Sequence, residues 1–259
     1  LEEVVCGIQE RVYGLALRML GHQEDAEDET QEILIKVITH LSDFREESAF
    51  STWVYRIACN HLLTVRKKRY ERMCLTFSSL EESLSAGLEN VEPLTASGPE
   101  RDVLLEETRV GCMQGALVCL KREVRIAVIL GEHYEVTSKE GAFILDITPE
   151  LFRKRLSRGR KSLQTFMQKN CGLINSDNPC RCHKQAGGRL KSGMIDMAFV
   201  KLESASKGRS EAVAQLAELD EIDRTIAMYR RYPEYNTPES FTHIMKDLIK
   251  SGKYNALSK

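Results

Sequence analysis

Apolar side chains recur at intervals of three and four residues over most of the chain, and this spacing constrains the fold more than any other feature. It is clearest between residues 24 and 41, where Ile33, Leu34, Val37 and Ile38 share one helical face and carboxylates occupy another. No Val/Ile-rich stretch alternates in the manner of a strand. The chain is therefore predicted to be essentially all-α, with helices that pack through apolar stripes.

No stretch approaches the roughly eighteen consecutive apolar residues of a membrane-spanning helix. Residues 1–11 carry charges instead of the apolar core of a signal peptide. We therefore expect no membrane span and a cytoplasmic location. The formal net charge of the 259 residues is -1, but acidic and basic residues lie in separate blocks. Blocks of opposite sign predict surfaces for different partners.

The acidic block holds six carboxylates between residues 24 and 32. Carboxylates this close repel one another and repel phosphates, so this face should not lie on DNA. It is either a solvated helix face or a binding surface for a basic protein.

The next predicted helix begins near Ser48 or Ser51, carries Phe50 and Trp53, and ends in the basic run 66–69. Aromatic rings beside Arg and Asn suit unpaired bases, because stacking contributes roughly 1 to 3 kcal/mol per base. The alternative is that these rings belong to the core. We expect Trp53 to serve both purposes. The polar positions assigned to nucleic acid are Ser51, Thr52, Arg56 and Asn60.

A helix-turn-helix signature follows later in the chain. A short helix starts at Thr137, a turn follows at Asp146, and Thr148 and Pro149 are a suitable N-cap and first residue for a longer helix to about Lys169. This last helix is rich in cations, which suits the major groove of duplex DNA. Phe152 and Leu156 should face inward. The residues left available to DNA are Glu150, Arg153, Lys154, Ser157 and Arg158.

The pattern divides the chain into four parts. Residues 1–74 form a helical packet, residues 75–107 an acidic linker with room for one short helix, and residues 108–170 the helix-turn-helix domain. Residues 171–259 form a cysteine-containing loop and a helical extension, for which a regulatory role is a hypothesis.

Candidate metal ligands are confined to the start of the extension. Eight cysteines in a cytosolic chain are expected to be reduced. Thiolates and an imidazole complete tetrahedral zinc sites, but a Cys-x-Cys pair is tighter than the common spacing. A zinc site and an ordered loop without metal both stay open, and no cofactor is expected to be required. The four candidate ligands are Cys171, Cys180, Cys182 and His183.

Three segments together resemble the bacterial extracytoplasmic-function sigma factors of the sigma-70 family. They read DAEDETQE at 25–32, FSTWVYRIACN at 50–60 and LFRKRLSRGRKSL at 151–163. They follow the family's order, with an acidic linker between the second and third, and the resemblance covers residues 5–170. It implies a non-enzymatic factor that lends promoter recognition and strand opening to RNA polymerase. Core polymerase and promoter DNA are the implied partners, and an anti-sigma factor is a further candidate.

The resemblance also implies residue roles. The acidic helix would dock on the clamp helices of the largest polymerase subunit through Asp25, Asp28, Gln31, Glu32 and Lys36. The second helix would open the minus-ten element and flip a base into a pocket, using Phe50, Ser51, Thr52, Trp53, Arg56, Asn60, Arg66 and Lys67. The helix from Pro149 would read the minus-thirty-five element through Glu150, Arg153, Lys154, Arg155, Ser157 and Arg158. The linker would thread through polymerase toward the RNA exit path.

The chain departs from the family pattern in the helix-turn-helix domain. Leu120 is followed by Lys-Arg-Glu instead of Pro-Pro, Asp146 replaces the usual turn glycine, and Pro149 and Glu150 replace small residues. These changes leave the base preference at minus thirty-five open. The alternative function is a freestanding helix-turn-helix regulator that contacts no polymerase. An enzyme is disfavoured, since no Ser-His-Asp spacing or Gly-rich phosphate loop stands out.

Overall fold

The computed structural model describes residues 2–65, 76–89, 97–191, 221–230, 235 and 237, and every regular element in these ranges is a helix. The all-α prediction is confirmed. None of the described helices is both long and apolar enough to cross a membrane. Contacts divide the chain into a first unit, Leu1–Met73 with Arg122–Leu156 and Glu234–Lys259, and a second unit, Cys74–Lys121 with Ser157–Pro233. Arg66, Lys67 and most of the predicted tail helices lie outside the described residues.

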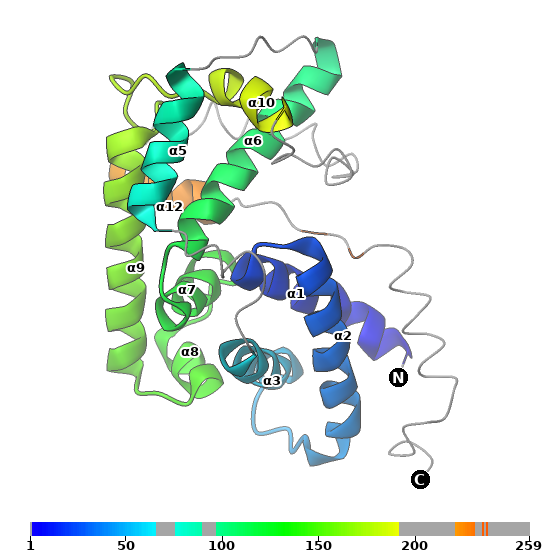
Figure 1. Cartoon of the computed structure of the whole chain (residues 1–259). Helices are drawn as coiled ribbons and strands as arrows, with labels where there is room; N and C mark the ends of the chain where they lie inside the picture. The colour runs from blue at the N-terminus through cyan, green and yellow to red at the C-terminus, as the bar shows by residue number, and fades with distance from the viewer. Residues whose placement is uncertain are drawn as a thin grey trace. The chain divides into compact units, whose positions relative to one another are not determined.

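Three helices and one short 3-10 turn open the first unit (Figure 1). They are α1 (Glu2–Leu20), α2 (Gln23–Thr39), η1 (Leu41–Asp43) and α3 (Phe50–Thr64). Helix α1 ends at Gly21, whose φ of 76° lets the chain reverse into α2. The buried stripe of α2 contains Ile33, Leu34 and Val37, as the sequence spacing predicts. Helix α1 packs on both α2 and α3, so this packet has one shared core.

The helix-turn-helix segment completes the first unit. Its elements are α7 (Arg122–Val128), the π-helical turn η2 (Ile129–His133), α8 (Ser138–Leu145) and the start of α9 (Pro149–Asn170). Arg125 is 3% exposed and donates to the carbonyl of Met19 at the end of α1. Helix α8 packs on α3. The helix-turn-helix and the N-terminal packet therefore form one compact body.

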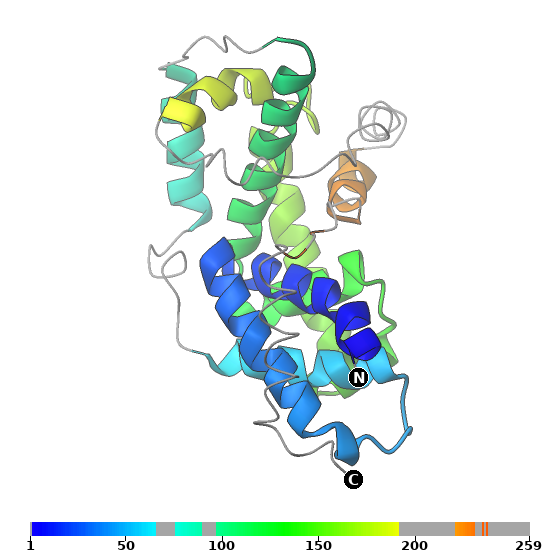
Figure 2. The same ribbon diagram turned by 90° about the vertical axis from the view of Figure 1, so that its right-hand side faces the viewer.

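The second unit contains α5 (Phe77–Glu89), α6 (Gly98–Val118), the rest of α9, α10 (Cys182–Lys191) and α12 (Glu221–Arg230). Helix α10 lies beside both α5 and α6 (Figures 1 and 2). Residues 75–107, predicted to be a linker, thus hold more helix than the one short element expected. Helix α5 forms because it has a narrow apolar stripe. Its Leu80 and Leu84 are buried, although Ser and Glu surround them in the sequence.

Candidate functional site

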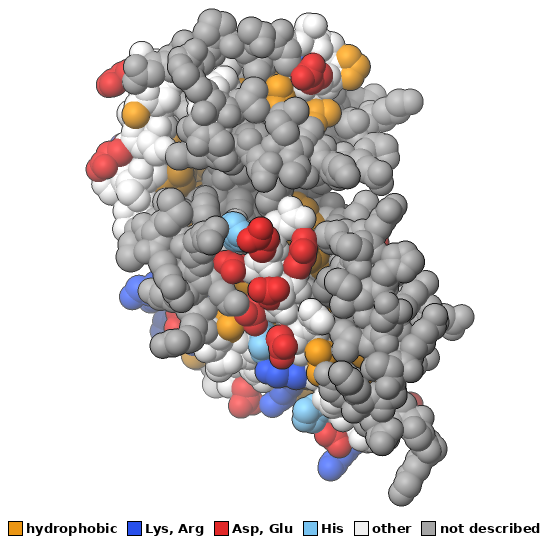
Figure 3. Space-filling model, turned by 45° about the vertical axis from the view of Figure 1, so that its right-hand side comes forward, with side chains coloured by type: hydrophobic (Ala, Val, Ile, Leu, Met, Phe, Trp, Pro, Cys, Tyr) orange, Lys and Arg blue, Asp and Glu red, His pale blue; other side chains and the backbone are white. Residues whose placement is uncertain are grey.

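Helix α2 exposes a charged stripe along its outer face. Glu24, Asp28, Glu32 and Lys36 follow one another at four-residue intervals, and all four are exposed. Figure 3 shows carboxylates gathered on this side of the molecule, with cationic and imidazole side chains next to them. Among the other residues predicted to bind polymerase, Asp25 and Gln31 are half-buried. The stripe thus consists of three carboxylates followed by one ammonium group.

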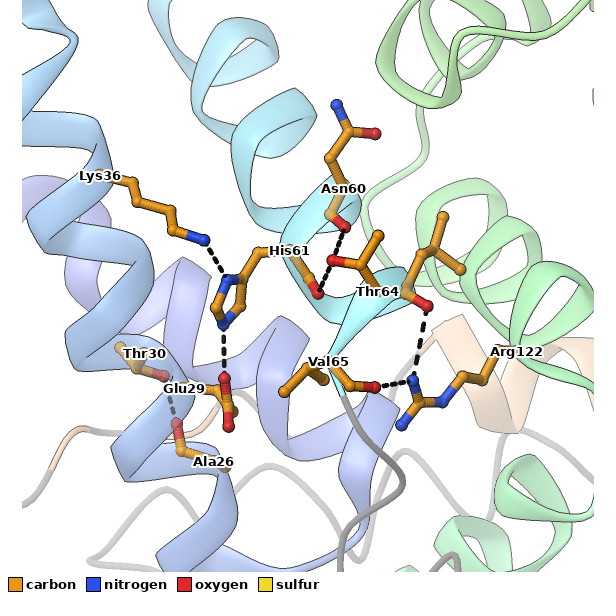
Figure 4. A network of polar contacts seen from close by, with 10 residues as sticks. Ala26, Glu29, Thr30, Lys36, Asn60, His61, Thr64, Val65 and Arg122 are labelled. Carbon is orange, nitrogen blue, oxygen red and sulfur yellow. Dashed lines mark hydrogen bonds and ion pairs between the residues drawn. The ribbon is translucent and has the colours of Figure 1, made fainter.

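One carboxylate of the acidic block is buried. Glu29 is 5% exposed, and its Oε2 lies 2.5 Å from Nε2 of His61 on α3. The other ring nitrogen of His61, Nδ1, lies 2.7 Å from Nζ of Lys36 (Figure 4). An ammonium can only donate, so Nδ1 accepts from Lys36 and the Nε2–H of a neutral imidazole donates to Glu29. This network ties α2 to α3 directly beneath the exposed stripe.

The sequence contained a signal for this burial. Glu29 lies four residues before Ile33 and eight before Val37, so it falls on the buried stripe and not on the exposed one. Its partner is 32 positions away and therefore could not be read from local spacing. Neither Glu29 nor His61 was assigned a role from the sequence.

Aromatic rings cluster at the start of α3. Phe44, Phe50 and Trp53 have ring centroids 5.4 to 5.8 Å apart, and all three side chains are half-buried. Their surfaces therefore contribute both to packing and to the exterior, and the predicted contact of Trp53 with nucleic acid stays a prediction. Phe44 lies in the loop before α3 and was not singled out from the sequence. Ser51, Thr52 and Arg56 are also half-buried.

An open pocket of about 420 Å³ lies between α2, η1 and α3. Trp53 and Asn60 line it from α3, and Lys36 and His61 line it from the polar network. Asn60 is exposed, and its side chain points away from the His61 network (Figure 4). The remaining lining residues are His40, Asp43, Ile57 and Thr64. The pocket thus combines one aromatic ring with several hydrogen-bonding groups.

The C-terminal end of α3 is held by the helix-turn-helix segment. Arg122 of α7 donates through Nη1 to the carbonyl of Val65 at 2.5 Å (Figure 4). Carbonyls at a helix end lack intrahelical partners, so a guanidinium there is favourable. Arg122 therefore ties the C-terminal end of α3 to α7.

The turn between α8 and α9 is well defined. Thr137 caps α8 with a reciprocal capping box to Glu140, and the Thr148 hydroxyl accepts from the Leu151 amide at 3.2 Å at the start of α9. Asp146 adopts the left-handed conformation, with φ 53° and ψ 48°. Asp is one of the few non-glycine residues that visits this region, so the fold tolerates the departure from glycine.

Helix α9 presents its cations to solvent. Its exposed predicted DNA-binding residues are Glu150, Arg153, Lys154, Ser157 and Arg158, and Arg155 is half-buried. Phe152 is 1% exposed and packs against the backbone of α8, where a Cβ on Gly141 would approach its ring within 2.3 Å. Gly141 is therefore needed for α8 and α9 to meet, a requirement that the sequence analysis did not identify.

The four candidate metal ligands are not assembled. Cys171, Cys180 and Cys182 are half-buried, whereas His183 is exposed. Within the described ranges, no three His, Cys, Asp or Glu side chains are arranged to hold a metal ion.

Comparisons with known proteins give one consistent family. Residues 8–71 match the profile of sigma-70 region 2. The chain is 32% identical over 171 residues to the ECF RNA polymerase sigma factor SigE of Mycolicibacterium smegmatis, covering 65% of this chain and 62% of that protein. It is 30% identical over 169 residues to the ECF RNA polymerase sigma-E factor of Escherichia coli K12, covering 64% and 85%.

Two further comparisons involve another curated relative and a solved structure. The ECF RNA polymerase sigma factor SigW of Bacillus subtilis is 29% identical, over 62% of this chain and 86% of that protein. The crystallised sigma factor RpoE of Bartonella quintana, in complex with the anti-sigma factor NepR, is 21% identical with a TM-score of 0.43, over 64% and 95% of the two chains.

Proposed function

The chain belongs to the extracytoplasmic-function sigma factors of the sigma-70 family, and from this premise we propose that it directs core RNA polymerase to specific promoters and promotes strand opening. The observation that carries the proposal is the pairing, within the matched region 2, of the exposed acidic stripe on α2 with the aromatic pocket on α3. The acidic stripe suits a basic protein surface and repels DNA phosphates, whereas the aromatic pocket suits an unpaired base.

The acidic stripe is the proposed polymerase contact. Asp28 and Glu32 are exposed and close in space, so a basic protein surface gains from both charges. Lys36 is at the stripe's end and donates to His61, which makes it a positioning group for the α2–α3 junction as well as a contact. Asp25 and Gln31 complete the proposed interface at its half-buried edge.

The pocket beside α3 is the proposed site for an unpaired minus-ten base. Trp53 offers a stacking surface, and Asn60 offers both a donor and an acceptor for a base edge. Taking a base out of the duplex costs a few kcal/mol, which stacking at roughly 1 to 3 kcal/mol per base offsets in part. Phe50, Ser51, Thr52 and Arg56 would contact the same strand, with Arg66 and Lys67 on its phosphates.

Helix α9 is the proposed reader of the minus-thirty-five element. Arg153, Lys154 and Arg158 are all exposed, and Lys154 lies one turn before Arg158. Guanidinium groups pair bidentately with guanine edges in the major groove. Glu150, Arg155 and Ser157 would complete the contact.

The proposed function assigns the chain to four parts. Residues 1–74 are region 2, residues 75–107 the linker, residues 108–170 region 4, and residues 171–259 an extension with a regulatory role.

Run-off transcription tests this proposal. Core polymerase is incubated with genomic fragments, with and without the whole chain, and the transcripts are mapped. A sigma factor co-elutes with core enzyme and produces discrete start sites that are absent with core alone. A freestanding regulator would bind duplex fragments, fail to co-elute and start no transcript, and that result would overturn the proposal. An anti-sigma factor, if present, should suppress the same transcripts.

A further inference from the structure

An apolar side chain is exposed on the first turn of α9. Leu151 is 39% exposed, and it is one of two large hydrophobic side chains that the described residues expose, the other being Phe143 of α8 at 41%. The guanidinium of Arg56 covers the Phe143 ring at 4.9 Å from the centroid. A single exposed leucine is ordinary on a protein surface, so the position of Leu151 on α9 decides what this side chain can do.

Two contacts fix the rotation of α9 about its own axis. Phe152 is 1% exposed, and a Cβ on Gly141 of α8 would come within 2.3 Å of its ring. One turn later, a Cβ on Gly131 of η2 would come within 2.8 Å of the Leu156 side chain. Leu151 precedes Phe152 by one residue, which turns it by about 100° around the helix. It therefore points away from the packed face.

The backbone of Leu151 is held as well. Its N–H donates to the Thr148 hydroxyl at 3.2 Å, which satisfies one of the amides that lack an intrahelical partner at the start of α9. Lys154 and Arg158 lie three and seven residues further along the same helical face, and both are exposed. Leu151 thus opens a face of α9 on which two cations follow.

We propose that Leu151 contacts the C5-methyl group of a thymine in the minus-thirty-five element. The inference rests on the proposed role of α9 as the reader of that element. In a helix-turn-helix, the N-terminal residues of the second helix reach the base edges in the major groove. Thymine presents an apolar methyl group there, beside its O4 acceptor. The leucine side chain has no donor or acceptor, so among the groups on these edges it gains only from the methyl.

The contact predicts selection of one base at one position. Against cytosine or a purine, the Leu151 side chain would shield a polar base edge from water without offering it a hydrogen bond, which costs free energy. Against thymine, it buries apolar surface on both partners. The cations on the same face attract phosphates and guanine edges. Leu151 therefore adds a preference for thymine that these cations do not supply.

Selection of duplexes by the holoenzyme tests this contact. Core polymerase with the whole chain selects from a pool in which the minus-thirty-five region of a promoter, mapped by run-off transcription, is randomised. Wild type should enrich thymine at one position, and Leu151→Ala should lower that preference by about fourfold, which corresponds to roughly 0.8 kcal/mol for one buried CH₂ group. Leu151→Met keeps an apolar side chain of similar volume and should retain the preference. Because Leu151 is exposed, both variants should keep the wild-type midpoint of urea unfolding.

A modified base isolates the methyl group. Deoxyuridine at the selected position removes only the C5-methyl, so it should weaken binding of the wild-type holoenzyme by about fourfold and leave binding of Leu151→Ala unchanged. The inference is overturned if wild type enriches no thymine, if Leu151→Ala selects as wild type does, if Leu151→Met loses the preference, or if deoxyuridine weakens both proteins equally. Arg153→Ala separates this failure from failure of the proposed function. A shift in the bases that it selects shows that α9 still reads the element, and no shift shows that it does not.

Discussion

The guanidinium of Arg56 on α3 lies 3.5 Å from the carboxylate of Asp146, in the turn of the helix-turn-helix. Arg56 also donates to the Phe143 carbonyl at 3.1 Å, and its guanidinium covers the Phe143 ring at 4.9 Å from the centroid. A side chain proposed to touch minus-ten DNA is thus engaged by the module proposed to read minus thirty-five. DNA bound at Arg56 must displace these contacts. The exposed ion pair contributes only about 0 to 1 kcal/mol of the free energy that this displacement costs, and the hydrogen bond and the ring contact add to it.

The left-handed conformation of Asp146 predicts how this turn responds to substitution. Asp146→Gly removes the ion pair but suits φ 53°, so the free energy of unfolding should change by less than about 1 kcal/mol. Asp146→Val places a β-branched residue there and should lower it by about 1 to 2 kcal/mol. Urea unfolding of both variants gives the comparison. Equal effects would show that backbone conformation is not what the position demands.

The Glu29–His61 pair predicts two different results for neighbouring carboxylates. Glu29→Gln removes a charged acceptor inside the packet and should lower the free energy of unfolding by about 1 to 3 kcal/mol. Glu32→Gln changes an exposed side chain and should stay within about 0.5 kcal/mol of wild type. Urea unfolding at neutral pH measures both. A stable Glu29→Gln protein would mean that the network contributes little.

The acidic stripe predicts a loss of polymerase affinity without loss of fold. Asp28→Asn together with Glu32→Gln should weaken binding to core enzyme by about 1 kcal/mol or more, and binding should become less sensitive to salt. Glu82→Gln, an exposed carboxylate on α5, is the control and should bind as wild type. Fluorescence anisotropy at several salt concentrations measures affinity. Unchanged affinity in the double variant would remove the role given to this stripe.

The exposed cations of α9 predict a loss of duplex recognition. Arg153→Ala or Arg158→Ala should each weaken binding of the holoenzyme to its promoter by about 1 to 3 kcal/mol, as expected for a lost base contact. Lys121→Ala removes an exposed cation outside α9 and serves as the control. Promoter binding is measured by gel shift against mutated minus-thirty-five sequences. If both arginine variants lost affinity equally for all sequences, the arginines would contact phosphates instead of bases.

His133 predicts a dependence of stability on pH. Burial, with a smaller effect of Arg18, lowers its pKa from 6.5 to about 3. Between these values the unfolded chain binds the extra proton, so stability falls as pH falls from 6.5 toward 3, at up to about 1.4 kcal/mol per pH unit. His133→Gln should flatten the slope between pH 5 and 6.5, where few carboxylates titrate. Urea unfolding across that window tests this, and parallel slopes would contradict it.

The local parts of the fold were predictable because their determinants are adjacent in sequence. The buried stripe of α2, the capped start of α8 at Thr137 and the start of α9 at Pro149 all lie where spacing and cap residues indicate. The exposure of Arg153 and Arg158 also follows from helical spacing around Phe152.

The missed features depend on partners far along the chain. Leu84 of α5 pairs through its carbonyl with Gln185, 101 positions later, so the helical content of the predicted linker could not be read from its own acidic composition. The contact of Arg56 with Asp146 spans 90 positions.

The amide of Gln185 has a double attachment, donating to the Leu84 carbonyl at 2.7 Å and approaching the sulfur of Cys180 at 3.8 Å. A thiolate draws such a donor more strongly than a neutral thiol does. An ionised Cys180 would therefore compete with the Leu84 carbonyl of α5 for the side-chain N–H groups of Gln185. The ionisation of Cys180 and the attachment of helix α5 to helix α10 therefore cannot vary independently.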